Sequence, residues 1–483
     1  MSMRWSNCRD AAHQGQLSHA NLAQLLEAQA AANHWSRISD WLPLLIEKGV
    51  AAGERKGSLI AIAAWLLQQR RAELANRLLR QVKWNEAGAT EWLLRGKVAL
   101  RIGDRDAAER HLIKATALPG GQPEAAYRLA QLYRSLGQFD QAAIWYLATL
   151  TCDPEPFVIH NELQFTRCSD TLLLELVSFY EGLCELQPER ALAALFLAHY
   201  LSKQGDMKRA ITESRRAARL ELGSLSDKLA PAEAEPTPPD FLILGMPKGG
   251  TTATLRWLDH VPDIWCHPRK ELHFFDGRFA HGSEWYCAQF PRFQDDATIL
   301  RGEATPNYFS HPETPNRVAQ LMPKARLVVL LRDPISRAVS WVQHLQRLEG
   351  LNGNVAQWLE QELNQLEPLN TEQLAAQPRI GTGALQDSCY DMHLQRWQVA
   401  LPGNTPLLLS SESLFTNPEV ELARLLKFLG KDADAGPWLQ HWQPLNVNPS
   451  APATLPADLK RRLKKFLQAQ CEHSLALSNH PIQ

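Results

Sequence analysis

The stretch that decides the fold is FLILGMPKGGTTATLRWLDH, residues 241–260. Its apolar beginning predicts a buried strand, its glycines a tight turn, and the residues after them a helix. A strand, a glycine turn and a helix N-terminus together form a phosphate-binding site, because backbone N–H groups and the helix dipole both face the anion. The groups that would hold the phosphate are Lys248, Gly249, Gly250, Thr251 and Thr252.

The order of residues in this turn bears on the kind of nucleotide. In nucleoside triphosphatases the lysine follows the glycines and stands next to a magnesium-binding hydroxyl. Here Lys248 precedes Gly249 and Gly250. The inversion argues against ATP or GTP hydrolysis and leaves a nucleotide kinase as a third hypothesis only.

A second motif, RDPISRAVSWVQH at residues 332–344, follows the apolar run 327–331. The Asp-Pro pair after a strand predicts the start of a helix. Arg332 would then stand at the tip of the strand, and Ser340 one to two turns into the helix. Both can reach one phosphate, the arginine through a charged fork and the serine through its hydroxyl.

The two motifs together resemble those of the sulfotransferases that use 3′-phosphoadenosine 5′-phosphosulfate (PAPS). KGGTT at 248–252 resembles the family's 5′-phosphosulfate loop, and the second motif resembles its 3′-phosphate motif RDPxxRAxSxxxH. KELHFFD at 270–276 and EATPNY at 303–308 resemble segments of the family members that modify heparan-type glycans. The resemblance covers roughly residues 240–470 and implies PAPS as co-substrate, a hydroxyl acceptor such as a glycan, and no metal.

Three positions depart from the family's pattern. The lysine of the glycan enzymes' EKTPxY segment is Ala304 here, so its contact is absent or supplied by another residue. The tryptophan that follows the threonine pair in the small-molecule enzymes is Ala253, so the adenine is expected to stack on another aromatic ring. The later part of the 3′-phosphate loop is placed only provisionally, at 445–450.

The resemblance also implies catalytic roles. Glu271 occupies the position of the base, which removes the proton of the acceptor hydroxyl, and Lys248 stabilises charge on the leaving phosphate oxygen. His273 is the rival base, or else a residue that orients Glu271; in an extended segment the two would share a face. We expect the neighbouring apolar residues to desolvate Glu271 and raise its basicity.

The chain has 483 residues, which predicts more than one domain. The stretch 229–240, LAPAEAEPTPPD, reads as an extended linker. Residues 1–228 are rich in Ala, Leu, Gln and Arg and predict helices, whereas residues 241–483 contain the apolar runs 241–244, 326–331 and 406–410 expected of parallel strands. The fold class is therefore an α-helical solenoid followed by a P-loop-like α/β sulfotransferase domain with a central parallel sheet.

The helical half contains a repeat marked by glycines. Gly103 and Gly137 are 34 residues apart, and Gly205 follows after 68 more, each with small residues at matching offsets. This resembles the tetratricopeptide repeat, a helix–turn–helix of 34 residues, with a degenerate copy expected around Thr171. Such a stack binds a partner protein or joins subunits.

Charge and composition exclude other classes. Lys and Arg number 51 against 52 Asp and Glu, so overall charge gives no attraction to nucleic acid or to a membrane surface. The basic segment 458–465 is expected to be a solvated helix face.

The eight cysteines are widely spaced, the first residues lack a secretory signal, and no apolar run is long enough to span a membrane. We therefore expect a cytoplasmic protein with reduced thiols.

The sequence thus predicts a sulfotransferase acting on a hydroxyl, most readily of a carbohydrate. Protein tyrosine and small metabolites are the alternative acceptors. A scaffold protein, in which the repeats bind a partner and the nucleotide fold is inactive, is the alternative from a different class.

Overall fold

In the computed structural model, the residues described are 19–33, 53–84, 87–121, 123–220, 222–294, 298–432, 434–445 and 453–478, with isolated positions between 34 and 52. Contacts divide the chain into two compact units, Met1–Arg167 and Cys168–Gln483. Every helix in the described part of the chain is too short or too polar to span a lipid bilayer.

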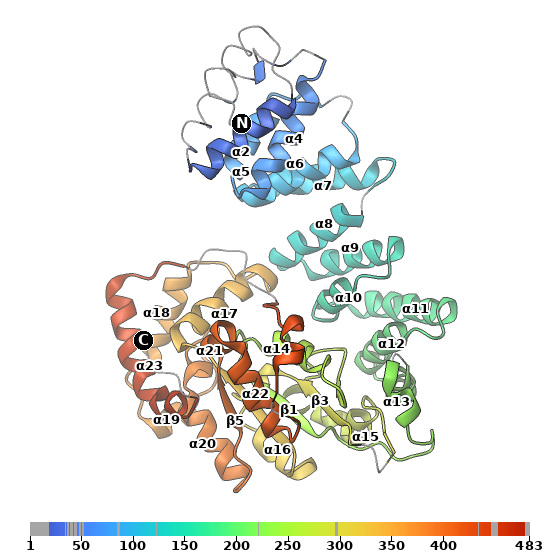
Figure 1. The fold of residues 1–483 in the computed structure, drawn as a ribbon, viewed down its shortest axis with the longest axis vertical. Coiled ribbons are helices and arrows are strands. Elements are labelled where there is room, and N and C mark those ends of the chain that lie inside the picture. Colours follow the sequence, from blue (N-terminus) through green and yellow to red (C-terminus); the bar gives the residue numbers. More distant parts are fainter. Residues whose placement is uncertain are drawn as a thin grey trace. The chain divides into compact units, whose positions relative to one another are not determined.

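The first unit is built from helices, as the composition predicts (Figure 1). Its helices are α2 (His19–Ala31), α4 (Arg55–Gln68), α5 (Ala72–Leu79), α6 (Ala89–Ile102), α7 (Arg105–Ala117), α8 (Pro123–Ser135), α9 (Phe139–Cys152) and α10 (Phe157–Gln164). Helices α6 and α7 pack as one antiparallel pair and α8 and α9 as the next.

The glycines of the repeat lie where the sequence predicts turns. Gly103 ends α6 with φ +81° and Gly137 follows α8 with φ +73°, a backbone conformation that favours glycine. Gly205, in the second unit, ends α12 (Ala191–Gln204) before α13 (Met207–Arg219) with φ +92°. The degenerate copy consists of the short α10 and of α11 (Asp170–Leu186), whose second residue is Thr171.

The second unit contains a five-stranded parallel sheet (Figure 1). Its strands are β1 (Phe241–Gly245), β2 (Ile264–Cys266), β3 (Leu300–Ala304), β4 (Arg326–Leu331) and β5 (Leu407–Ser410), in the order β2-β3-β1-β4-β5. The three predicted strands are confirmed as β1, β4 and β5. Strands β2 and β3 were not predicted, because β2 is only three residues long and β3 contains Arg301, Gly302 and Glu303.

Helices cover the sheet of this unit. They are α14 (Thr251–Leu258), α15 (Gly282–Cys287), α16 (Thr314–Leu321), α17 (Pro334–Leu348), α18 (Val355–Leu366), α19 (Thr371–Ala376), α20 (Tyr390–Ala400), α21 (Ser411–Thr416), α22 (Pro418–Phe428) and α23 (Ala457–Leu477). Short helical turns lie at Gly223–Lys228, Phe274–Arg278, Phe279–His281, Pro306–Tyr308, Gln386–Ser388 and Gly436–His441.

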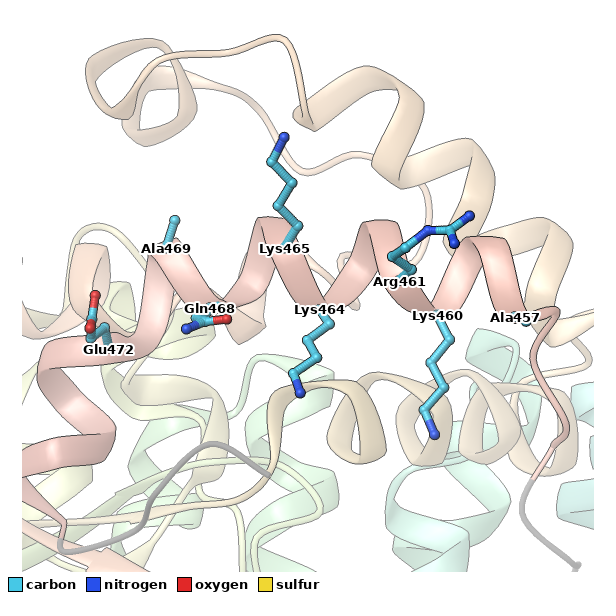
Figure 2. A pocket seen from close by; sticks show the side chains of 8 residues that line it. All are labelled: Ala457, Lys460, Arg461, Lys464, Lys465, Gln468, Ala469 and Glu472. Carbon is cyan, nitrogen blue, oxygen red and sulfur yellow. The ribbon is translucent and has the colours of Figure 1, made fainter.

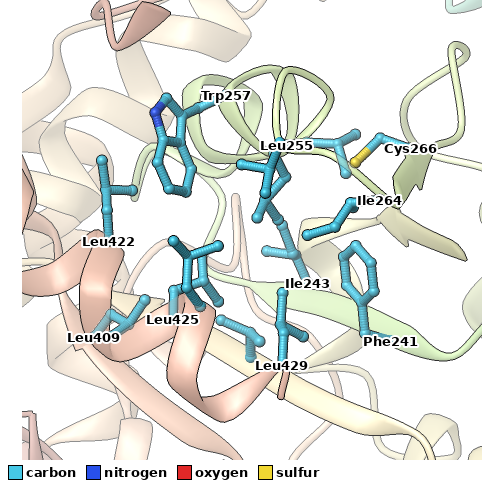
Figure 3. Close-up of a cluster of buried hydrophobic side chains, with 14 of the residues drawn as sticks. Phe241, Ile243, Leu255, Trp257, Ile264, Cys266, Leu409, Leu422, Leu425 and Leu429 are labelled. Carbon is cyan, nitrogen blue, oxygen red and sulfur yellow. The ribbon is translucent and has the colours of Figure 1, made fainter. Parts of the chain in front are cut away.

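The core of the sheet shows why these sequences form strands. Phe241 and Ile243 of β1 point to the face that α14 and α22 cover, where they meet Trp257 and Leu425 (Figure 3). Leu242 and Leu244, which alternate with them along the strand, are also fully buried, on the opposite face of the sheet. Burial on both faces explains the continuous apolar runs of a parallel sheet.

The Pro-rich stretch 229–240 is non-helical, as expected, and lies along the α/β part of the second unit. Ala230 N donates to Arg292 O at 2.9 Å, and the guanidinium of Arg301 donates to Pro238 O at 2.8 Å. The helices α11–α13 belong to this unit too, with α13 packed on α15. The domain boundary at 229–240 stays a prediction from composition, whereas contacts divide the compact units between Arg167 and Cys168.

Candidate active site

The predicted phosphate loop joins the carboxyl end of β1 to α14. Lys248 has φ +73° and Gly250 has φ +99°, so the chain turns sharply before the helix begins at Thr251. A Cβ atom on Gly249 would lie 2.6 Å from Leu330 O, which shows that only glycine allows the loop to lie this close to β4. Thr251 is buried and Thr252 is half-buried at the start of the helix.

The second motif meets the first, because β1 and β4 are parallel neighbours and their carboxyl ends lie at one edge of the sheet. Arg332 Nη1 donates to Lys248 O at 3.1 Å. Asp333 caps α17 by accepting from Ser336 N at 2.7 Å, and Ser340 lies within the first two turns of that helix. The predicted placement of Arg332 at the strand end and Ser340 on the helix is confirmed.

The segment that carries Glu271 follows β2 and lies beside β3. Glu271 N donates to Ala304 O at 3.0 Å. Glu271 has φ +65° and His273 has φ +54°, so the segment is not extended at these two residues and the condition for a shared strand face is not met. Their side chains nevertheless come together: His273 Nε2 lies 3.6 Å from Glu271 Oε2.

Four charged side chains form a chain through this segment. Lys270 Nζ lies 2.5 Å from Glu271 Oε1, and His273 Nδ1 lies 2.8 Å from Asp276 Oδ2. His273 therefore stands between two carboxylates, and Glu271 between two cations. Opposite charges at these distances stabilise the charged form of each group.

The expectation that Glu271 has raised basicity is wrong. Burial does raise the pKa of this carboxyl, but the charge of Lys270 and the hydrogen bond and charge of His273 outweigh it, so its pKa lies well below the usual range. For His273, burial lowers the pKa, yet hydrogen bonds to Asp276 and Glu271 raise it to about 9. Glu271 is thus a carboxylate and His273 an imidazolium at neutral pH.

Lys248 stands among other cations. Burial, followed by the charges of Arg347, Lys270 and Arg332, lowers its pKa to about 8. Like charges this close favour the binding of an anion, because the anion relieves their mutual repulsion. Arg347 lies at the end of α17, beyond the motif that includes Arg332 and Ser340.

A buried carboxylate supports the backbone of the catalytic segment. Glu303 accepts hydrogen bonds from the hydroxyls of Thr305 at 2.7 Å and Tyr308 at 2.9 Å. Those hydroxyls in turn accept from the backbone N–H groups of His273 at 3.4 Å and Phe274 at 2.9 Å. Desolvation raises the pKa of Glu303 to about 7, and the network holds His273 in its left-handed conformation.

A second anchor reaches the segment from the helical repeats of the same unit. The Arg269 side chain, 2% exposed, donates to Nδ1 of His199 on α12 and to Gln289 Oε1 at 2.8 Å. It precedes Lys270 and Glu271 directly. The helix α12 therefore holds the start of the segment that carries the candidate base.

Replacing Arg269 with methionine is expected to lower the free energy of unfolding by about 1–3 kcal/mol, because two buried acceptors lose their donor. Urea denaturation followed by circular dichroism measures it. The control is Arg215→Met, whose ion pair with Glu284 is solvent-exposed, with an expected change within about 0.5 kcal/mol. An unchanged or higher stability of the Arg269 variant would show that burying this guanidinium costs more than its hydrogen bonds return.

The basic helix predicted at 458–465 is α23, and its charged side chains are solvent-exposed. Lys460, Arg461, Lys464 and Lys465 line an open hollow of about 720 Å³ along the helix (Figure 2). The hollow includes no residue of the two phosphate motifs or of the segment 270–276. We therefore place the candidate site at the carboxyl edge of the sheet and not here.

Sequence reasoning missed the roles of four residues. Lys270, Asp276 and Glu303 stand inside the motifs that point to the family, but nothing in their spacing shows that they contact Glu271, His273 or the backbone of that segment. Nothing in the sequence around Arg347 indicates a role in the site, because only the path of α17 brings this residue toward Lys248. Of the three departures, Ala253 is buried in α14, and 446–450 of the stretch 445–450 lie outside the described residues.

Comparison with known proteins was made on sequence and structure. Residues 238–449 match the family model described as sulfotransferase domain, and residues 123–156 match a tetratricopeptide repeat. The chain is 35% identical over 193 residues to human heparan sulfate glucosamine 3-O-sulfotransferase 6, covering 40% of this chain and 52% of that protein. It is 33% identical over 205 residues to human bifunctional heparan sulfate N-deacetylase/N-sulfotransferase 3, covering 40% of this chain and 22% of that protein.

The chain thus spans about half the length of the first relative and about a fifth of the second. Among solved structures, a sulfotransferase from Alicyclobacillus acidocaldarius aligns with a TM-score of 0.38 and 22% identity, covering 50% of this chain and 96% of that chain.

Proposed function

We propose that this protein, whose residues 238–449 match the model of the sulfotransferase domain, transfers a sulfuryl group from PAPS to a hydroxyl group, most readily of a carbohydrate. The observation that carries the proposal is the meeting of three segments at one edge of the sheet. These are the phosphate loop with Lys248, the end of β4 with Arg332, and the segment with Glu271.

The residues present fit the donor. Gly249 lets the loop 248–252 lie close to β4, and the loop leads directly into the N-terminus of α14, whose first N–H groups can bind an anion. Lys248 and Arg332 supply positive charge beside it, and Ser340 a hydroxyl. When bound, the donor supplies a sulfuryl group on a good leaving phosphate; the protein has to hold it in line with the acceptor and neutralise its oxygens.

Between the two candidate bases, the geometry favours Glu271. His273 donates to Asp276 and faces Glu271, so both of its ring nitrogens face carboxylates and its pKa is raised to about 9. An imidazolium cannot accept the proton of the acceptor hydroxyl. His273 then orients Glu271, and Glu271 accepts the proton.

The pH dependence of kcat tests this assignment. With Glu271 as base, kcat at saturating substrates is expected to stay flat between pH 6.5 and about 7.5, because the carboxylate is already ionised and Lys248, whose pKa is about 8, is still mostly protonated. If His273 were the base, only its deprotonated fraction would react, and kcat would climb about tenfold per pH unit up to its pKa. An anionic donor beside His273 would raise that pKa further, so the climb would not be hidden at lower pH.

The acceptor class rests on the relatives, which are named as enzymes of heparan sulfate. The test is transfer of radiolabelled sulfate from PAPS to a panel of glycans, tyrosine peptides and small alcohols. We expect label on glycans. Label confined to peptides or small alcohols would move the acceptor class, and absence of transfer together with absence of nucleotide binding would favour a scaffold protein.

A further inference from the structure

Lys270 is the charged residue of the site that the proposed mechanism has not used. Its ammonium lies 2.5 Å from Glu271 Oε1, and only 13% of its side chain is exposed. It also lies close enough to Lys248 to lower the pKa of that lysine. Lys270 therefore stands between the candidate base and the cation expected at the leaving group.

Lys270 lies beside the position that the transferred sulfuryl group has to occupy. In-line transfer places the sulfuryl group between the leaving oxygen, beside Lys248, and the acceptor oxygen, beside Glu271. A cation close to both of those residues is close to the sulfuryl oxygens. The fourth cation, Arg347, acts on Lys248 from α17.

The same contact is an obstacle to catalysis. A carboxylate that is paired with an ammonium and also faces an imidazolium is a poor proton acceptor, and the pKa of Glu271 is accordingly low. Lys248 repels Lys270, and the ion pair with Glu271 opposes this repulsion. A second anion in the site would compete with Glu271 for the ammonium.

We infer that Lys270 is a further catalytic residue that changes partner: it pairs with Glu271 in the free enzyme and moves to the sulfuryl oxygens when the donor is bound, which frees Glu271 for the acceptor hydroxyl. The inference rests on the proposed function and adds an order of events to it. The base becomes active only after the donor is bound, so the acceptor hydroxyl can lose its proton to Glu271 only after donor binding.

Transfer of the sulfuryl group exchanges one bond to sulfur for another. The bond between sulfur and the bridging phosphate oxygen breaks, its electron pair stays on that oxygen beside Lys248, and a bond forms between sulfur and the acceptor oxygen. The acceptor proton goes to Glu271, which Lys270 no longer neutralises. Lys270 keeps its proton throughout and offsets charge on the sulfuryl oxygens.

The groups that face Glu271 define what a titration would detect. They are Lys270 and His273 from its own segment, with Asp276 behind His273, and Lys248 from the loop after β1. Arg332 at the end of β4 and Arg347 on α17 act in turn on Lys248. At pH 5 all the cations are protonated, since His273 titrates near pH 9 and Lys248 near pH 8. Glu271 is the member of this set whose release from Lys270 leads to proton uptake at that pH.

Isothermal titration calorimetry at pH 5 in two buffers of different ionisation enthalpy measures the protons taken up on binding. The two probes are PAPS and its desulfonated product 3′-phosphoadenosine 5′-phosphate (PAP), which lacks the group that Lys270 would bind. A glutamate that returns to its ordinary pKa near 4.3 binds about 0.2 proton at pH 5. The 5′-phosphate of PAP, whose second pKa is about 6, releases protons of its own when it binds cations at pH 5. The informative quantity is therefore the difference in proton uptake between PAPS and PAP, compared between the unmodified protein and a variant that lacks the Lys270 charge, and we expect it to be about 0.2 proton larger in the unmodified protein.

Two variants separate the contribution of Lys270 from direct repulsion between the sulfuryl group and Glu271. In Lys270→Met, Glu271 is unpaired from the start, so the difference between PAPS and PAP should shrink, while PAP affinity stays within about threefold because Lys248 and Arg332 are intact. Lys270→Arg keeps the charge and should restore the difference. Lys228→Met is the matched control, since Lys228 also forms an ion pair, with Asp263 at 2.6 Å, just before β2 at the opposite edge of the sheet.

The outcomes distinguish this inference from the proposed function. A difference between PAPS and PAP that is the same in the unmodified protein and in Lys270→Met would overturn the role of Lys270 and leave the sulfotransferase proposal standing, because direct repulsion and the ligand's own titration would then explain it. Failure of both nucleotides to bind would overturn the proposed function itself.

Discussion

Glu271→Gln is expected to lower kcat for sulfuryl transfer by about 10²–10⁴-fold, the usual contribution of a general base. Glutamine keeps the size of the side chain and can still contact Lys270 and His273, but it cannot take up the acceptor proton. The affinity for PAP should be unchanged or higher, because the variant removes a negative charge beside the nucleotide's phosphates. Initial rates at saturating substrates measure kcat, and calorimetry with PAP measures the affinity.

The control for this variant is Glu313→Gln. Glu313 pairs with Arg317 on α16 and is mostly exposed, so transfer should be unaffected. A Glu271 variant that keeps more than a tenth of the activity would assign the proton to another group. Loss of PAP binding along with activity would indicate instead that the segment beside β3 has rearranged.

Lys248→Met should impair both binding and chemistry. Removing a charged hydrogen-bond donor costs about 1.5–3 kcal/mol, which weakens PAP by roughly 10- to 100-fold. The loss of charge beside the leaving oxygen should lower kcat by a further 10²–10³-fold, as for other groups that stabilise charge in the transition state. Methionine retains the length of the side chain, so the left-handed turn at this position is disturbed little.

The pattern of the losses identifies the role of Lys248. A fall in PAP affinity without a fall in kcat would make it a binding residue only. If neither the PAP affinity nor kcat falls, Lys248 is not part of the site, and the loop 248–252 is not the phosphate loop. Lys228→Met again serves as the control, because its partner Asp263 lies just before β2, at the edge of the sheet opposite to the carboxyl ends that carry the nucleotide motifs.

The fold was largely predictable from local sequence, for reasons visible in particular residues. The runs at β1 and β4 are apolar at every position because both faces of a parallel sheet are covered, so they are recognisable without any long-range information. The repeat was recognisable because left-handed turns at Gly103 and Gly137 demand glycine. Strand β3 escaped prediction because Arg301 and Glu303 are buried through specific hydrogen bonds, which composition does not reveal.

The candidate site was predictable in some of its members but not in its electrostatics. The residues expected to hold a phosphate are neighbours in sequence, and their chemistry follows from their type and order. The pKa of Glu271 was predicted to rise and instead falls, because the contact with Lys270 outweighs desolvation. The sign of such a shift depends on which side chains meet, and two adjacent residues meet only when the backbone turns as it does at φ +65°.

The sequence by itself determined that residues 241–260 and 327–344 are two strand-to-helix turns, since each is written in consecutive residues and each obeys local backbone rules. Only the tertiary structure decided that these turns share one edge of a sheet, that Arg269 is held by His199, 70 residues earlier, and that Lys270 neutralises Glu271. The physical reason is that hydrogen bonds and charge pairs depend on distance in space, and distance between separated segments is set by packing.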